Sequence, residues 1–336
     1  MAENIEENKK EDALIISSSP HLLSKENVHR IMYTVILALV PAIAASVYFY
    51  RLNAVILLLV CTITAVLTEF LVQRFMKKDT TAYDGSAAIT GLLLALTLPP
   101  SFPIFGAVLG SVFAVAIGKQ IFGGLGFNIF NPALLGRAFL QATYPVLITT
   151  WHDPVAGSLM VDVVSSATPL ALMKFEGGMT SHLSLLFGNV SGSLGETSAI
   201  AVLIGGLFLR LRGYVNWKLP LGYLGSMAAV GALFWFINPG KYPDPLFHIT
   251  AGGAMLGAWF MVTDMVTSPT TPKGQWIFAV SAGALAVIIR LFGGLPEGVM
   301  YSILLMNSIV PLLNRYTRPK VFGEIKQGAP KGGAKT

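Results

Sequence analysis

The sequence is poor in cysteine and in charge. Cys61 is the one cysteine among 336 residues, so no intrachain disulfide can form. No Cys-x-x-Cys pair exists to ligate an iron–sulfur cluster, and no Gly-x-Gly-x-x-Gly dinucleotide fingerprint is present. Charged residues make up 12% of the chain, about half of the roughly 25% that is usual in soluble domains.

Apolar residues predominate in the sequence. They make up 54% of the sequence, and the mean hydropathy is +0.66. Several apolar runs approach the roughly 20 residues that a helix needs to cross a bilayer. The composition therefore predicts an all-α, polytopic membrane protein in contact with lipid. Cys61 lies within one such run, where it is expected to be a small buried apolar residue.

The two ends of the chain are polar. Residues 1–28 form a mixed-charge tail without the apolar stretch of a cleaved signal peptide. Residues 315–336 are basic and glycine-rich. Both are expected to be cytoplasmic tails. The net charge of +6 resides mostly in tails and helix ends, where membrane topology places it, so no nucleic-acid partner is expected.

Ten membrane segments are predicted between the tails, several of them short or interrupted by proline. Their residues are 31–50, 54–75, 86–98, 104–121, 132–148, 198–211, 219–237, 246–262, 275–292 and 297–313. With the N-terminus inside, most of the 23 Lys and Arg lie on the cytoplasmic side, including Lys119 at a helix end. This topology puts the loop of residues 149–197 outside.

An internal repeat divides the chain into residues 29–148 and 198–314. Thr97-Leu-Pro recurs as Thr267-Ser-Pro and Phe122-Gly-Gly-Leu recurs as Phe292-Gly-Gly-Leu, both at an offset of 170 residues. Because each unit has five crossings, the two must be inverted. Interrupted segments at matching positions of inverted repeats mark central binding sites, so the breaks at Thr97 and Thr267 point to an internal site.

The external loop carries the sequence Asp162-x-x-Ser165-Ser166-Ala167-Thr168-Pro169. A residue before proline is biased toward an extended conformation, which would present the Thr168 hydroxyl on an irregular, exposed segment. By composition alone this is an ordinary turn.

The same stretch resembles the flavin-attachment motif of the Rnf and Nqr membrane redox complexes, with Ser166 where the family often has glycine. Residues 84–99 and 126–139 are similar to this family as well. The similarity covers nearly the whole chain and favours the D subunit of Rnf complexes. The homologous B subunit of sodium-pumping NADH:quinone reductases, which has a longer N-terminal tail, is the close alternative.

The resemblance implies FMN joined through its phosphate to the hydroxyl of Thr168, within a loop formed by Asp162, Ser165, Ser166 and Ala167. A free threonine hydroxyl is a weak nucleophile, so a flavin transferase would make the bond. The resemblance also implies a non-covalent riboflavin, Rnf subunits A, B, C, E and G as partners, and a bacterial or archaeal cytoplasmic membrane. The chain would relay electrons in an ion-translocating ferredoxin:NAD oxidoreductase without being catalytic alone.

Other polar residues are candidates for internal sites. Asn128, Asn131 and Arg137 could bind riboflavin, or could equally bond the backbone of broken helices or each other. Asp264 and Glu69 could belong to an ion path, since carboxylates at membrane depth are costly and often functional. Alternatively, Asp264 caps a turn and Glu69 reaches the cytoplasmic surface.

No metal site is expected, because the histidines lack metal-ligand spacing. The competing class of function is a solute transporter or channel, which inverted repeats would suit. A covalent flavin would decide between the two classes.

Overall fold

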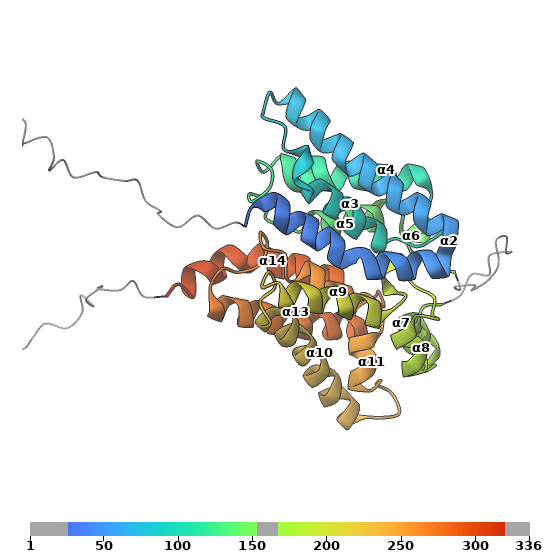
Figure 1. Cartoon of the computed structure of the whole chain (residues 1–336). Helices are drawn as coiled ribbons and strands as arrows, with labels where there is room; N and C mark the ends of the chain where they lie inside the picture. Colours follow the sequence, from blue (N-terminus) through green and yellow to red (C-terminus); the bar gives the residue numbers. More distant parts are fainter. Residues whose placement is uncertain (1–25, 153–166, 320–336) are drawn as a thin grey trace, which may run out of the picture.

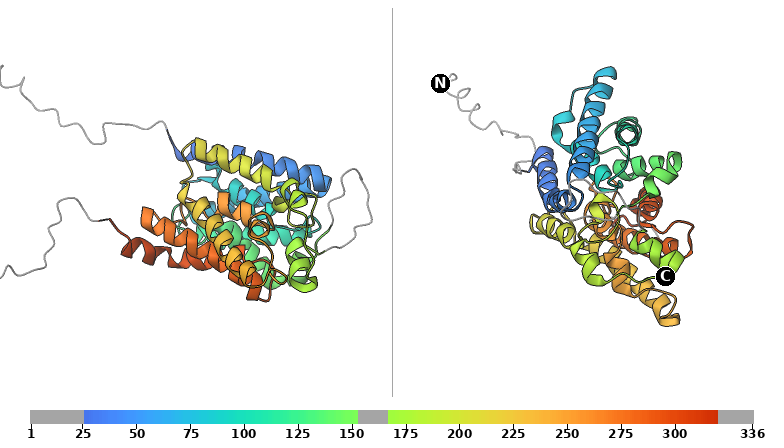
Figure 2. Two further views of the ribbon diagram at one scale, coloured as in Figure 1. Left: turned by 90° about the horizontal axis from the view of Figure 1, so that it is seen from below. Right: turned by 90° about the vertical axis from the view of Figure 1, so that its right-hand side faces the viewer.

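The computed structural model describes residues 26–152 and 167–319, and every element in these ranges is helical. The predicted all-α class is confirmed for this part of the chain. In Figure 1 the helices of the N-terminal half lie above those of the C-terminal half. The start of α2 and the end of α14 lie at one end of the helical body, and α6, α7 and α8 lie at the other (Figure 1; Figure 2, left).

The N-terminal half begins with a long element that is two helices joined at a kink. Helix α2 spans Val28–Phe75, but Arg51 has φ 50° and ψ −125°. A positive φ is uncommon for a residue other than glycine and cannot continue a helix. The kink at Arg51 therefore separates the first two predicted segments.

The remaining elements of this half are short. They are η1 (Ala82–Asp84), α3 (Ser86–Leu96), α4 (Ile104–Val112), the π-helix η2 (Phe113–Gln120), α5 (Pro132–Thr143) and α6 (Pro145–Thr149). Helix α5 begins as the sequence predicts, with Pro132 at its first position and Asn131 as its N-cap. The predicted fifth segment is not continuous, because it is interrupted at Tyr144.

The connection between the halves contains α7 (Pro169–Ala171), the π-helix η3 (Leu172–Glu176), α8 (His182–Phe187) and η4 (Leu194–Glu196). The second half consists of α9 (Ala199–Leu211), α10 (Lys218–Ile237), α11 (Pro245–Thr250), α12 (Ala254–Leu256), the π-helix η5 (Gly257–Met261), α13 (Pro272–Phe292) and α14 (Val299–Tyr316).

The predicted continuous segment 246–262 is wrong. Helix α11 ends at Thr250, and Gly252 then takes a φ of 66°, a conformation that favours glycine. Arg290 of α13 satisfies the end of α11 by donating to the carbonyls of His248 (2.6 Å) and Ala251 (2.9 Å). A buried cation thus replaces the missing turn of helix.

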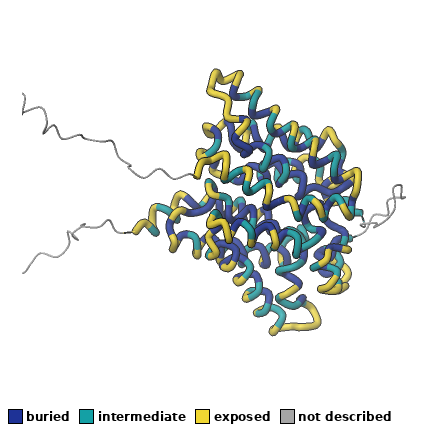
Figure 3. Tube along the Cα trace, viewed as in Figure 1, coloured by how far each residue is buried: buried dark blue, intermediate teal, exposed yellow. Residues whose placement is uncertain are grey.

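Within residues 26–152 and 167–319, three helices are long and apolar enough to span a membrane: α2, α10 and α13. The outer face of α2 carries an apolar stripe, with Leu59, Ile63, Leu67 and Leu71 each more than half exposed at a spacing of four residues. Such a large exposed apolar surface fits lipid or a partner subunit rather than water. Figure 3 shows the buried residues concentrated inside this surface.

Close approach between helices depends on glycine. Gly91 of α3 packs on α2 where a Cβ atom would lie 2.6 Å from the carbonyl oxygen of Cys61 and 2.7 Å from the Cα of Thr62. Small residues allow this contact in membrane helices. Cys61 is fully buried there, as predicted.

Candidate functional site

Thr168 is buried, with 6% of its surface exposed, and it is the N-cap of α7. Its backbone is extended, as expected before a proline, and its Oγ1 accepts a hydrogen bond from the amide of Ala171 at 3.2 Å. The expectation of an exposed hydroxyl is therefore wrong. Leu170 fixes α7 to the body by packing with Met173, Leu185, Phe247 and Ala251 in a small apolar cluster.

Of the other motif residues named above, the structure describes Ala167. Ala167 precedes Thr168, and the two residues line one cavity together. Asp162, Ser165 and Ser166 lie outside the described residues.

A cavity of about 340 Å³ opens beside Thr168; we call it the Thr168 cavity. Its size falls in the range of about 300–1,000 Å³ that holds small ligands and cofactors. Aromatic rings and a guanidinium face it from several elements. The lining includes Arg137, Gln141, Thr149, Trp151, Ala167, Thr168, Phe175, Glu297, Met300 and Tyr301.

Arg137 is the buried cation of this cavity. It is 4% exposed and forms an ion pair with Glu297, which precedes α14. Its Nε atom has no hydrogen-bond partner in the described part of the chain. Since buried polar groups are normally paired, this N–H is free to donate to a ligand.

Lys174 of η3 binds the carbonyl end of α13, close to this cavity. Its Nζ donates to the carbonyls of Arg290 (2.9 Å) and Leu295 (3.1 Å) and to that of Gly293, at the end of α13. Burial lowers the pKa of the Lys174 ammonium. The lysine therefore stabilises the carbonyl end of α13 and adds positive charge near Thr168.

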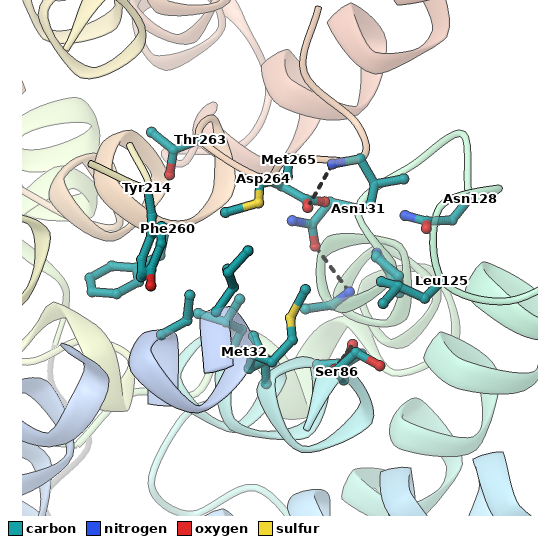
Figure 4. A pocket seen from close by; sticks show the side chains of 18 of the residues that line it. Met32, Ser86, Leu125, Asn128, Asn131, Tyr214, Phe260, Thr263, Asp264 and Met265 are labelled. Atoms are coloured by element: carbon teal, nitrogen blue, oxygen red, sulfur yellow. Dashed lines mark hydrogen bonds between the residues drawn. The ribbon is translucent and has the colours of Figure 1, made fainter. Parts of the chain in front are cut away.

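A second cavity, of about 100 Å³, lies beside the start of α2; we call it the Asn131 cavity (Figure 4). Asn128, Asn131 and Asp264 line it together with Ser86 and Lys119. Arg137 does not line it. The structure thus separates Arg137 from the two asparagines with which the sequence analysis grouped it.

The polar residues of the Asn131 cavity mostly bond backbone. Asn131 Oδ1 accepts from the amides of Ala133 (3.1 Å) and Leu134 (3.3 Å), and Asn128 donates to the carbonyl of Phe130 (3.2 Å). Asp264 accepts from the amide of Val266 (3.2 Å) and the hydroxyl of Thr267 (2.9 Å).

The backbone-bonding alternatives for Asn128, Asn131 and Asp264 are therefore observed. Side-chain atoms of the same residues still face the cavity (Figure 4).

The two Thr-x-Pro breaks are buried but take different roles. Thr97 donates to the carbonyl of Leu94 (2.7 Å) at the end of α3. Asn307 of α14, which sequence analysis missed, joins the second break to α5. With its amide oriented to suit both neighbours, it accepts from the amide of Asn131 (3.1 Å) and donates to the carbonyl of Thr267 (3.3 Å).

Glu69 is not near the surface, because it is fully buried in an ion pair with Lys119. Lys119 Nζ lies 2.8 Å from both Glu69 carboxylate oxygens and 2.5 Å from Ser86 Oγ. Gln73 (3.1 Å) and Gln120 (2.8 Å) also donate to Glu69. Lys119 lies in the last turn of η2, at a helix end, but its ammonium is buried against Glu69 rather than exposed.

These features define a class of protein: a helical membrane protein with broken helices and with buried charge beside its internal cavities. Residues 15–323 match the NQR2, RnfD, RnfE family. The chain belongs to this family.

Relatives span almost the whole chain. It is 45% identical over 327 residues to the D subunit of the proton-translocating ferredoxin:NAD(+) oxidoreductase complex of Clostridium ljungdahlii, covering 94% of this chain and 97% of that protein. It is 46% identical over 318 residues to the D subunit of the Na(+)-translocating ferredoxin:NAD(+) oxidoreductase complex of Acetobacterium woodii, covering 93% and 96%. It is 40% identical over 344 residues to the D subunit of the ion-translocating oxidoreductase complex of Stutzerimonas stutzeri, covering 93% and 96%.

Proposed function

We propose that this chain is the flavin-carrying membrane subunit of an ion-translocating ferredoxin:NAD oxidoreductase of the Rnf type. The family match and three relatives named as D subunits support this over the B subunit of a sodium-pumping NADH:quinone reductase. The partners are the other Rnf subunits, A, B, C, E and G. They bind ferredoxin and NAD, for which this sequence has no motif.

FMN is attached through its phosphate to Thr168, in the loop that includes Asp162, Ser165, Ser166 and Ala167. The observation that carries this assignment is the position of Thr168 on the wall of a cavity of about 340 Å³. Arg137, with its unpaired Nε, is suited to an anionic or carbonyl group, and Trp151 and Tyr301 are suited to an aromatic ring. A bound flavin supplies an electron carrier at this place.

The burial of Thr168 determines when a flavin transferase acts. The hydroxyl is 6% exposed and occupied as a helix cap, so the enzyme must reach it while α7 is undocked. A helix of three residues, fixed mainly by Leu170, separates easily from the body. Modification therefore precedes or interrupts the docking of α7.

The Asn131 cavity is the proposed riboflavin site. Asn128 and Asn131 offer amide groups, and Asp264 and Lys119 provide charge at the same cavity. Asp264 and Glu69 remain the candidates for an ion path. The full pairing of Glu69 with Lys119 favours a fixed charge there rather than a mobile ion.

We also propose the two-repeat architecture of ten crossings, with cytoplasmic tails (residues 1–28 and 315–336) and an external flavin loop (residues 149–197). The offset of 170 residues relates α3 to the helix ending before Thr267, α4 with η2 to α13, and α5 to α14. Helix α7 lies at the opposite end of the body from the start of α2 and the end of α14, which agrees with an external loop (Figure 1).

The test is flavin fluorescence on a denaturing gel, with wild type and Thr168→Ala expressed beside an active flavin transferase. A phosphoester-linked flavin stays on the band, and we expect the signal in wild type only. Thr149→Ala is the matched control, because Thr149 lines the same cavity and its hydroxyl donates to the carbonyl of Pro145 at 2.7 Å. A dark wild-type band would refute the covalent flavin and favour a non-redox transporter.

A further inference from the structure

Two carboxyl groups meet beside Thr168. Glu196 ends η4, Glu297 precedes α14, and both carboxyl groups line the same two small cavities within hydrogen-bonding reach of each other. A Cβ atom on Gly253 would lie 3.4 Å from Glu196 Oε1 and 3.8 Å from Glu297 Oε1, so the two carboxyl groups approach the same glycine. Glu196 Oε1 is enclosed and receives no N–H or O–H donor from the described residues.

A hydrogen bond between two carboxyl groups requires a proton. An ionised carboxylate has only acceptor atoms, and a protonated carboxyl group has one O–H donor. Two carboxylates at this distance cannot both be ionised without strong repulsion. The contact between Glu196 and Glu297 is therefore the geometry of a pair that shares one proton.

Cations surround the pair. Arg137 of α5 is ion-paired with Glu297, and Arg290 of α13 attracts the same carboxyl group. The titratable and charged groups that face the pair are Arg137 of α5, Tyr223 of α10, Arg290 of α13 and Tyr301 of α14. With one shared proton, two guanidinium groups face one negative charge, so the cluster has a net positive charge.

The pair borders the proposed flavin site. Thr168, Glu196 and Glu297 together line a small cavity, and Thr168 and Glu297 also line the Thr168 cavity with Arg137. A charge placed on Thr168 would thus be separated from the pair by little protein. The Coulomb interaction between two such close charges is strong where water is excluded.

We propose that Glu196 and Glu297 form a proton-binding site next to Thr168, which holds one proton between the two carboxyl groups and binds a second when negative charge is added at Thr168. The second proton comes from water and joins the remaining carboxylate oxygen, which leaves two neutral carboxyl groups. It returns to water when the added charge is removed, and only O–H bonds form and break. The second half of this proposal rests on the proposed flavin at Thr168; the shared proton does not.

The test is infrared difference spectroscopy of the purified complex, oxidised minus reduced, in H2O and D2O. In wild type we expect the C=O band of a protonated carboxyl group to grow on reduction and to shift in D2O. Glu196→Gln and Glu297→Gln should each shift this band, because one carboxyl group remains to take the proton, and the double variant should lose it while the gel fluorescence at Thr168 persists. A glutamine amide can donate in place of the shared proton, so Glu196→Gln should fold; Glu297→Gln also removes the counter-charge of Arg137, so its folding is checked first by circular dichroism. Glu176→Gln, an exposed carboxylate on η3, is the matched control and should keep the band.

Two results would overturn the proposal: no such band in wild type that carries the flavin, or an unchanged band in the double glutamine variant. The Thr168→Ala complex separates this failure from that of the proposed function. Spectra of that complex recorded over a pH titration should still show one carboxyl group of the pair losing its proton, and the double glutamine variant should abolish this signal. If the gel shows no flavin on wild type, the redox-linked step is wrong, and the pH titration alone decides the shared proton.

Discussion

The buried ion pair between Lys119 and Glu69 should be essential for the fold. The two side chains are 2% and 0% exposed, and both carboxylate oxygens lie 2.8 Å from the ammonium. Lys119→Met removes the cation and leaves a carboxylate without charge compensation. Breaking a buried pair from one side typically costs about 3–5 kcal/mol.

A second estimate agrees with this magnitude. The lone carboxyl group can escape its burial by taking a proton. For a group of ordinary pKa, about 4.3, protonation at pH 7 costs about 4 kcal/mol, at about 1.4 kcal/mol per pH unit. The destabilisation of Lys119→Met should therefore be about 3–5 kcal/mol at pH 7 and should fall by about 2 kcal/mol at pH 5.5.

The double variant Lys119→Met/Glu69→Gln tests the reasoning. It removes both charges and keeps an amide for Gln73 and Gln120, so it should recover at least about 2 kcal/mol of the loss. The assay is heat unfolding of the detergent-solubilised complex, followed by circular dichroism at both pH values. A loss below about 1 kcal/mol for Lys119→Met, or a double variant no more stable than the single one, would refute a compensated buried pair.

Two further predictions use the same unfolding assay. Gly91→Ala should lower the free energy of unfolding by about 1–3 kcal/mol, because its Cβ would lie 2.6 Å from the carbonyl oxygen of Cys61. Gly225→Ala should be neutral or stabilising, because its Cβ would meet nothing within 4 Å. Equal effects of the two substitutions would show that helix propensity, and not the close contact, determines the change in stability. Asn131→Ala should lower the free energy of unfolding by about 0.5–2 kcal/mol, because the N-cap of α5 is removed. Asn131→Ser keeps a capping oxygen and should recover most of this loss. A serine variant as unstable as the alanine variant would contradict capping as the cause.

Local signals in the sequence predicted local structure well. Pro132 and Asn131 announced the start of α5, because a cap and a first-turn proline act within a few residues. The sequence predicts two separate membrane segments on either side of Arg51, and the kink at this residue confirms the break between them. Thr168 was correctly expected to be extended, since the constraint comes from the next residue, Pro169.

Burial and partnership could not be predicted in the same way. Lys119 looks like a helix-end lysine, but the π-helix η2 shifts the register and turns it toward Glu69, 50 residues earlier. Thr168 looks like a loop residue because its burial depends on Leu170 meeting Phe247 far along the chain. No sequence motif marks Glu196 or Glu297, because only the fold brings these two glutamates together.

Helix α5 connects the two polar regions and explains why they must be considered together. Asn131 caps its first turn at one cavity, and Arg137 faces the other cavity from six residues later, a rise of about 9 Å along the helix. Asn307 and Glu297, at and just before α14, hold the same two residues through the amide of Asn131 and the guanidinium of Arg137. A shift of α5 against α14 would therefore alter both cavities at once. The pairing of these two helices is a direct physical connection between the Thr168 cavity and the Asn131 cavity.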